Sequence, residues 1–212
     1  ADDFVLLVVG TRRQADEERD ALAKFLLEEM RLELSAEKTL ITRPEDGFDF
    51  LGYRVVRAPS LRRGVAVGKL RIPKDKLKAL RREIKKRTDR SSLWLSPKQL
   101  FRNLNPLITG WRTYFQFATY ACQEFDKLDH WLWWRIDRWL RKKYRRTAKR
   151  VRRAKFRAGN TPALRWRWMD GAVVLKRFTD GGTRRYRNRG GKIPNGWNKE
   201  DLDGPAWHAS PS

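Results

Sequence analysis

Two adjacent carboxylates stand at the start of the sequence, in the stretch ADDFVLLVVG at residues 1–10. Asp2 and Asp3 directly precede the apolar run of residues 4–9, which predicts a buried strand. Because neighbouring carboxylates repel each other, the pair is costly unless a cation offsets its charge. Carboxylates on a rigid strand edge can hold Mg²⁺, which takes up charge in nucleotidyl transfer. The alternative is a surface turn that ends in two solvated acids.

Positive charge is concentrated in the middle of this 212-residue chain, whose formal net charge is +24. Residues 54–157 contain 32 Lys and Arg against 7 Asp and Glu, whereas residues 1–53 contain 7 against 13. Such a density repels itself unless a polyanion neutralises it, and nucleic acid is favoured over an anionic membrane or an acidic protein. Ten Trp and ten Phe supply a core, so the chain is not a disordered basic tail.

Two further features narrow the class of protein. No stretch approaches the roughly 18 consecutive apolar residues of a membrane span. Cys122 is the single cysteine, which excludes a disulfide framework and a cysteine zinc site. We therefore expect an intracellular, cytoplasmic protein without a membrane partner. Because residue 1 is Ala, we also expect the natural gene product to begin further upstream.

The residues that could do chemistry need helices and strands to position them. Apolar periodicity, turn residues and the helix-start signals Pro73, Ser96–Pro97 and Asn105–Pro106 predict these elements. In chain order they are a strand at 4–9, a helix within 15–34 with acids in its first turn, two short strands around the turn 44–47, helices at 73–88, 97–104, 106–121 and 125–150, and a small hairpin within 166–178.

Lys and Arg lie on the outer faces of the predicted helices, where they can follow a phosphate backbone and gain free energy through counterion release. A solvated basic face without a ligand is the alternative. The candidate nucleic-acid-binding residues are Gly52, Lys74, Lys78, Arg81, Arg82, Lys85, Arg112, Arg135, Arg138, Lys142, Arg145 and Lys149. Gly52 is included because glycine permits a close backbone approach, although a strand bulge would also explain it.

Four tryptophans lie within residues 131–139 and suggest base stacking. Helical spacing places Trp131 and Trp139 near the apolar stripe, so we expect both in the core. Trp133 and Trp134 are the better candidates for a contact with RNA or with another part of a larger protein.

Several stretches resemble group II intron reverse transcriptases. ADDFV, LELSAEKTLI and GFDFLGY resemble the end of the palm domain, and LNPLITGWRTYF with FDKLDHWLWWRIDRWLRKK resembles the thumb, or maturase X, domain. The stretches follow the family's order and cover roughly residues 1–146. The resemblance implies an α+β chain: a small β/α palm remnant at 1–57, a mainly α-helical thumb bundle at 58–150, and an irregular basic extension at 151–212 that could contact DNA.

The resemblance also implies roles for individual residues. Asp2 would be the principal Mg²⁺ ligand and Asp3 its companion. Lys38 would lie near the incoming nucleotide, where an ammonium group can neutralise departing pyrophosphate, although an ordinary solvated lysine is the simpler explanation. The stretch FLGY, which includes Gly52, would help to hold the primer end.

These implications lead to three hypotheses. The first is the C-terminal part of an RNA-directed DNA polymerase that binds an RNA template, a DNA primer and intron RNA. Family members need a further metal-binding Asp and a fingers region that this sequence does not contain, so we expect the chain alone not to polymerise without the missing fingers and palm. The second is a non-catalytic RNA-binding splicing factor, and the third is a basic nucleic-acid-binding module with an incidental acid pair. The natural RNA partner and the oligomeric state stay open.

Overall fold

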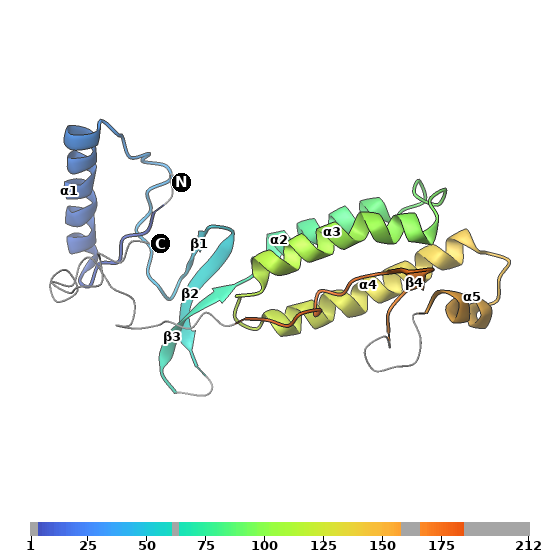
Figure 1. Ribbon diagram of the computed structural model, residues 1–212. Coiled ribbons are helices and arrows are strands. Elements are labelled where there is room, and N and C mark those ends of the chain that lie inside the picture. Colours follow the sequence, from blue (N-terminus) through green and yellow to red (C-terminus); the bar gives the residue numbers. More distant parts are fainter. Residues whose placement is uncertain (1–3, 61–63, 158–165, 185–212) are drawn as a thin grey trace, which may run out of the picture.

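The computed structural model describes residues 4–60, 64–157 and 166–184 (Figure 1). The expected α+β class is confirmed: a small antiparallel sheet precedes a bundle of helices. Among the described helices, none combines the length and the apolar composition that crossing a membrane requires. The elements are α1 (Arg12–Met30), β1 (Phe48–Phe50), β2 (Tyr53–Pro59), β3 (Ala66–Arg71), α2 (Lys74–Arg87), α3 (Pro97–Phe115), α4 (Ala121–Lys143), α5 (Lys149–Phe156), β4 (Met169–Asp170) and β5 (Val173–Val174).

The first helix, α1, starts earlier than the sequence predicted because Thr11 caps it. The Thr11 hydroxyl accepts a hydrogen bond from the Gln14 N–H, and the Gln14 side chain accepts one from the Thr11 N–H. The first turn therefore contains no acid, and the prediction of acids in that turn is wrong. None of the residues of α1 is buried, and Figure 1 shows the helix at one end of the molecule, apart from the other helices.

Two strand predictions near the N-terminus are wrong. Residues 4–9 form no strand and are exposed, because no described strand offers them a backbone partner. The turn at residues 44–47 is present, but the strand expected before it is not. Instead β1 pairs with β2 around Leu51 and Gly52, whose φ angles are 45° and 72°. Positive φ at both turn residues gives the twist that joins two antiparallel strands tightly.

This hairpin turn is seated on the C-terminal half of α3. The Tyr114 hydroxyl donates a hydrogen bond to the Leu51 carbonyl, and the Tyr53 hydroxyl donates one to the Tyr114 carbonyl. The two rings stack with their centroids 5.5 Å apart. A Cβ at position 52 would lie 2.9 Å from the Tyr114 hydroxyl. Gly52 is thus required both by its φ angle and by the close approach of Tyr114.

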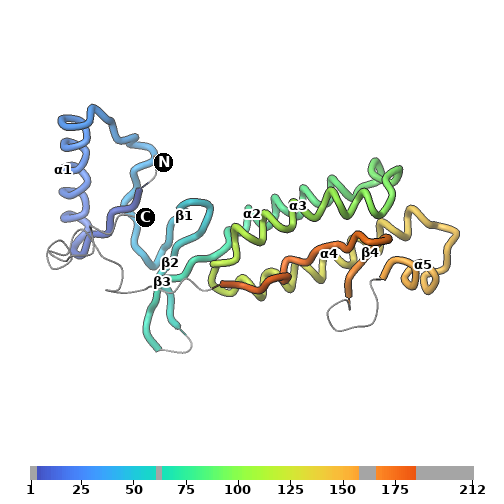
Figure 2. Tube along the Cα trace, viewed as in Figure 1, coloured from blue at the N-terminus to red at the C-terminus, as the bar shows by residue number. Residues whose placement is uncertain are grey.

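Helices α2, α3 and α4 lie side by side and enclose the main core (Figure 2). The expected start of α3 is confirmed, since Ser96 caps it in a capping box with Gln99 and Pro97 follows at the first helical position. The predicted break at Asn105–Pro106 is wrong, because α3 continues through Pro106. The Asn105 side chain does not cap a new helix but donates to the Val174 carbonyl and accepts from the Lys176 N–H.

The predicted long helix at 125–150 is two helices, α4 and α5. Helix α4 ends at Lys143, and Tyr144 leaves helical geometry with φ −108° and ψ 55°. Its ring packs 5.2 Å from that of Phe156, which is buried at the end of α5. Arg153 of α5 also donates to the buried carboxylate of Asp137 on α4, at 3.1 Å. These contacts fold the basic α5 back along α4 in place of one long charged helix.

We call residues 166–184 the C-terminal strap. The expected hairpin is confirmed in it as β4 paired with β5. The strap runs beside α3 and α4 (Figures 1 and 2), and its side chains Trp168, Leu175 and Phe178 are buried in the main core. This part of the predicted basic extension is therefore packed against the helices, while residues 158–165 and 185–212 of the extension lie outside the described residues. Domain boundaries at 57 and 150 stay a prediction.

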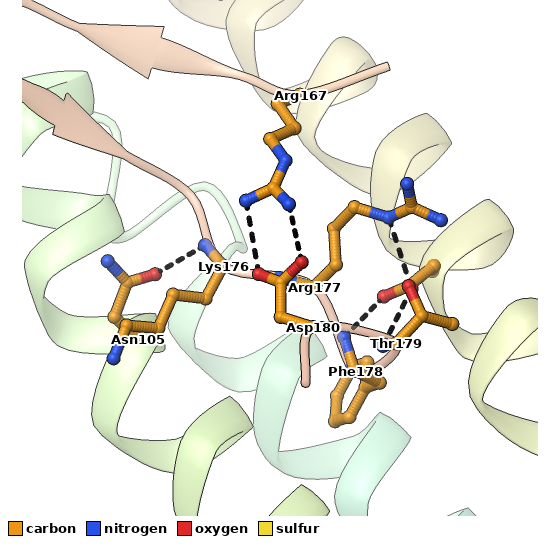
Figure 3. Close-up of polar contacts among 8 residues, drawn as sticks. Asn105, Arg167, Lys176, Arg177, Phe178, Thr179 and Asp180 are labelled. Carbon is orange, nitrogen blue, oxygen red and sulfur yellow. Dashed lines mark hydrogen bonds and ion pairs between the residues drawn. The ribbon is translucent and has the colours of Figure 1, made fainter. Parts of the chain in front are cut away.

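One buried carboxylate holds the middle of the strap. Asp129 of α4 accepts hydrogen bonds from the Phe178 N–H at 2.7 Å, the Thr179 N–H at 3.1 Å and the Thr179 hydroxyl at 2.7 Å. The Arg177 guanidinium lies 3.3 Å away (Figure 3). Burial raises the pKa of Asp129, while the hydrogen bonds from Thr179 and Phe178 and the charge of Arg177 oppose that rise.

We expect Asp129→Ala to lower the free energy of unfolding by about 3–5 kcal/mol, since it leaves a buried N–H group, a partly buried N–H group and a guanidinium without their acceptor. Urea denaturation followed by tryptophan fluorescence measures the effect. Asp126→Ala is the matched control, because this exposed acid lies one turn earlier on α4 and should change stability by no more than about 0.5 kcal/mol. Equal stabilities of the two variants would contradict the anchoring role of Asp129.

Candidate nucleic-acid interface

A stripe of basic side chains follows the outer face of α2. Leu80 and Ile84 are the buried residues of this helix, and they fix which face points to the core. Positions 74, 78, 82 and 85 recur at helical spacing on the outer side, and all four are exposed lysines or arginines. Arg81 lies between this stripe and the core, with its guanidinium 5.9 Å from the centre of the Trp131 ring.

Arg135 joins α2 to α4. Its guanidinium donates to the Thr88 hydroxyl at 2.8 Å, the Thr88 carbonyl at 3.0 Å and the Lys85 carbonyl at 3.2 Å. It thereby satisfies the C-terminal end of α2, where carbonyl groups favour positive charge. Burial lowers the pKa of Arg135, and the nearby charge of Arg138 lowers it further. We therefore assign Arg135 to the packing of the two helices and leave it out of the exposed surface.

Arg138 and Lys142 follow Arg135 at positions i+3 and i+7 on α4, and both are exposed. Arg135 brings this stripe of α4 to the C-terminal end of α2, and we take the basic side chains of the two helices together as one candidate surface. We call this set the α2–α4 cationic surface. It consists of Lys74, Lys78, Arg81, Arg82, Lys85, Arg138 and Lys142.

Four other predicted binding residues lie elsewhere. Arg145 is in the turn after α4 and Lys149 begins α5, so neither continues the stripe of Arg138 and Lys142 as the predicted single helix required. Arg112 of α3 lies against the strap, where its guanidinium occupies the space that a Cβ on Gly181 would need. With Arg167, Lys176 and other strap residues it lines a hollow of about 390 Å³. Gly52 lies in the turn seated on Tyr114, and its predicted contact with a primer stays a prediction.

Of the predicted catalytic residues, Lys38 alone lies within the described part of the chain. Asp2 and Asp3 lie outside the described residues, and Lys38 is exposed in a turn that follows α1. Within the ranges 4–60, 64–157 and 166–184, no three His, Cys, Asp or Glu side chains gather in a group that could hold a metal ion. The Mg²⁺ site therefore stays a prediction from the sequence.

The burial of the four tryptophans of α4 agrees with the prediction at three positions and differs at Trp133. Trp139 is buried and Trp131 is partly buried, as expected. Trp134 is 41% exposed, which fits the expected contact surface. Trp133 is only 7% exposed, because Trp168 of the strap stacks on its ring and Arg153 lies over it. The expectation that the Trp133 ring is part of a contact surface is wrong.

The sequence analysis did not predict that residues of the C-terminal strap line candidate binding sites. Arg167 forms two hydrogen bonds with the Asp180 carboxylate, at 3.1 and 2.5 Å, and Figure 3 shows this pair beside Arg177. Asp170 accepts a hydrogen bond from the Lys98 N–H in the first turn of α3. The signal available in the sequence was the alternation Trp166 and Trp168 before an Asp-Gly turn, which is typical of a half-buried hairpin.

Comparison with known proteins finds similarity in the helical part of the chain. Residues 77–157 match the family model described as the maturase-specific domain of group II introns. Protein YkfC of Escherichia coli (strain K12) is 43% identical over 60 residues, which are 28% of this chain and 16% of that protein. The group II intron-encoded protein LtrA of Lactococcus lactis subsp. cremoris is 38% identical over 71 residues, 32% of this chain and 12% of that protein. The chain thus matches less than a fifth of the length of either relative.

Stability measurements can test whether Arg135 joins the helices while Arg138 is only a surface residue. We expect Arg135→Ala to lower the free energy of unfolding by about 1.5–3 kcal/mol, because the carbonyls at the end of α2 lose a charged donor. The matched control is Arg138→Ala, an exposed change one turn away that should cost no more than about 0.5 kcal/mol. Thermal unfolding followed by circular dichroism measures both variants. A larger loss for Arg138→Ala than for Arg135→Ala would show that the two roles are reversed.

Proposed function

We propose that the chain binds RNA through the α2–α4 cationic surface, because residues 77–157 match the family model described as the maturase-specific domain of group II introns. The observation that carries the proposal is the exposed basic stripe of α2, continued across the junction made by Arg135 onto α4. Only Asp75 and Glu83 are acidic in α2, and Glu83 is paired with Arg87 at 2.7 Å. The stripe is thus left with a strong excess of positive charge for a phosphate backbone.

We further propose that the RNA is a template–primer or intron RNA, and that the chain serves within a larger RNA-directed DNA polymerase. Similarity to a group II intron-encoded protein supports the intron RNA as partner, and the resemblance of residues 1–57 to the end of a palm domain supports the polymerase. In that setting Asp2 and Asp3 would hold Mg²⁺, which supplies charge neutralisation during nucleotidyl transfer. Lys38 would lie near the incoming nucleotide. The described helices would bind the RNA and would not take part in nucleotidyl transfer.

A non-catalytic splicing factor is the second candidate function. The family match falls on α2 to α5, the part of the chain that presents the cationic surface, and not on the segment that contains the acid pair. Such a protein would hold folded intron RNA with the same side chains. The two functions share one binding surface and differ in whether Asp2 is needed.

Charge reversal tests the proposed surface. With about six to ten phosphates contacted, RNA affinity should fall by roughly 10³ to 10⁵ between 50 and 200 mM salt. We expect Lys78→Glu with Lys85→Glu to weaken binding by about 100-fold at 0.1 M salt and to lower the slope of log affinity against log salt by about two. Fluorescence anisotropy with a DNA-primed RNA template measures both quantities.

The control for that experiment is a double variant of α1, Arg12→Glu with Lys24→Glu, which changes the net charge equally on a helix outside the surface. It should bind within about threefold of the unchanged chain, since only distant electrostatics are altered. If the two double variants weaken binding equally, net charge and not the α2–α4 cationic surface explains the affinity.

The acid pair separates the two candidate functions. In the larger enzyme we expect Asp2→Asn to abolish primer extension while RNA affinity is unchanged, because a metal ligand is lost and no phosphate contact is. Undiminished synthesis would contradict the role of Asp2. Splicing that survives Asp2→Asn but fails after charge reversal of Arg138, Lys142 and Arg145 would favour the splicing factor.

A further inference from the structure

A cavity of about 380 Å³ opens between α4 and the C-terminal strap. Its volume lies in the range of about 300–1,000 Å³ that is usual for small-ligand sites. Four tryptophans line it: Trp133 and Trp134 come from α4, and Trp166 and Trp168 come from the strap. We call this cavity the Trp pocket. On α4 it uses the stripe of Asp126, His130 and Trp133, which is a different stripe from that of Arg135 and Arg138.

The rings of the Trp pocket have two kinds of environment. Trp133 and Trp168 stack with centroids 4.9 Å apart and are 7% and 1% exposed, so they form its floor. The Trp168 indole N–H donates to the Trp133 carbonyl, which fixes the strap to α4 at this point. Trp134 and Trp166 meet the Trp133 ring edge to face at 4.8 and 5.5 Å and are 41% and 54% exposed. Their exposed faces are available to a flat ligand.

The charges around the pocket select against a cationic ligand. An aromatic cage can bind an ammonium group, but here guanidinium groups already lie over the rings: Arg153 is 4.9 Å from the Trp133 centre and Arg157 is 5.9 Å from the Trp166 centre. Basic side chains also outnumber acids in the cavity lining, which contains Arg167, Lys176 and Arg177 against Asp126 and Asp129. This positive setting favours a ligand that combines an aromatic ring with negative charge, as a nucleotide does.

Among the described residues, two buried donors of the pocket lining, Trp133 Nε1 and Arg167 Nε, lack a hydrogen-bond partner. The Trp133 Nε1 group forms no hydrogen bond within the part of the chain that the structure describes, although its side chain is more than nine-tenths buried. Buried N–H groups are almost always paired. Because the Trp133 Nε1 atom is itself covered, a ligand in the pocket meets the exposed rings of Trp134 and Trp166.

We propose that the Trp pocket receives an unpaired nucleobase of a bound RNA, stacked on Trp134 and Trp166, with its phosphate near Lys176 and Arg177. This inference rests on the proposed RNA-binding function and adds a preference for single-stranded segments. The strap holds the cationic rim in place, since the Lys176 N–H donates to Asn105 and the Arg177 N–H donates to Asp180 (Figure 3). Base stacking on aromatic rings tolerates any sequence, so the pocket recognises an unpaired base and not a particular one.

The test uses the full 212-residue chain, a single-stranded oligoribonucleotide that carries 2-aminopurine, and a blunt RNA duplex of equal length. We expect Trp134→Ala with Trp166→Ala to weaken single-strand binding by about tenfold and to remove the quenching of 2-aminopurine, while duplex affinity changes by no more than about twofold. Trp94→Ala is the matched control, because Trp94 is 77% exposed in the loop between α2 and α3 and lies outside the pocket. Circular dichroism establishes that all variants are folded.

Equal single-strand affinity and equal quenching in the unchanged chain and the double variant would overturn the pocket proposal and leave RNA binding by α2 and α4 standing. If the unchanged chain binds neither RNA, the proposed function fails, and adenosine monophosphate then tests the pocket alone. Quenching of tryptophan fluorescence by this nucleotide in the unchanged chain, lost in the double variant, supports the pocket. Identical quenching in both proteins overturns it.

Discussion

Two buried carboxylates on α4 organise the C-terminal third of the described chain. Asp129 accepts hydrogen bonds from the strap, and Asp137 lies 3.1 Å from Arg153 and 4.0 Å from Arg152 of α5. They are eight residues apart, so both fall near one face of the helix. The segments that they hold are strongly basic and would be repelled by the Arg and Lys side chains of α4. A buried acid that is surrounded by donors offsets this repulsion where the chains meet, and apolar contacts complete the packing.

Sequence reasoning succeeded where the cause is local. The capping residues Ser96 and Pro97 are adjacent to the helix that they start, so the start of α3 could be read directly. It failed where a distant segment decides the outcome. Pro106 is preceded by a good capping residue, yet Asn105 bonds to the strap, and the apolar residues on either side keep α3 continuous. The run at 4–9 has the composition of a buried strand, but a strand also needs a partner for its backbone.

The candidate interface could be predicted in part, because a local sequence pattern places some of its residues. Helical periodicity alone places Lys74, Lys78 and Lys85 on the outer side of α2, because the apolar residues of the same helix define the inner side. Periodicity could not distinguish Arg135 from Arg138, since only the position of Thr88 on another helix makes one of them a structural donor. Trp133 was misjudged because the ring that covers it, Trp168, lies 35 residues further along the chain. Long-range contacts of this kind leave no short-range sequence pattern.

The arrangement gives α4 two different surfaces along its length. One stripe joins the basic side chains of α2, which suits sugar-phosphate backbones of any sequence. The other stripe meets the strap and encloses aromatic rings, which suit bases that are free of a duplex. A folded RNA offers both kinds of structure within a short distance, whereas a regular duplex offers only the first. The C-terminal strap creates the difference between these two surfaces. Without Trp166 and Trp168, the Trp133 ring would be exposed on a basic helix. Helix α4 would then present basic and aromatic side chains but no pocket. We therefore expect the proposed preference for folded RNA over a regular duplex to depend on residues beyond the family match, in the segment that Asp129 holds.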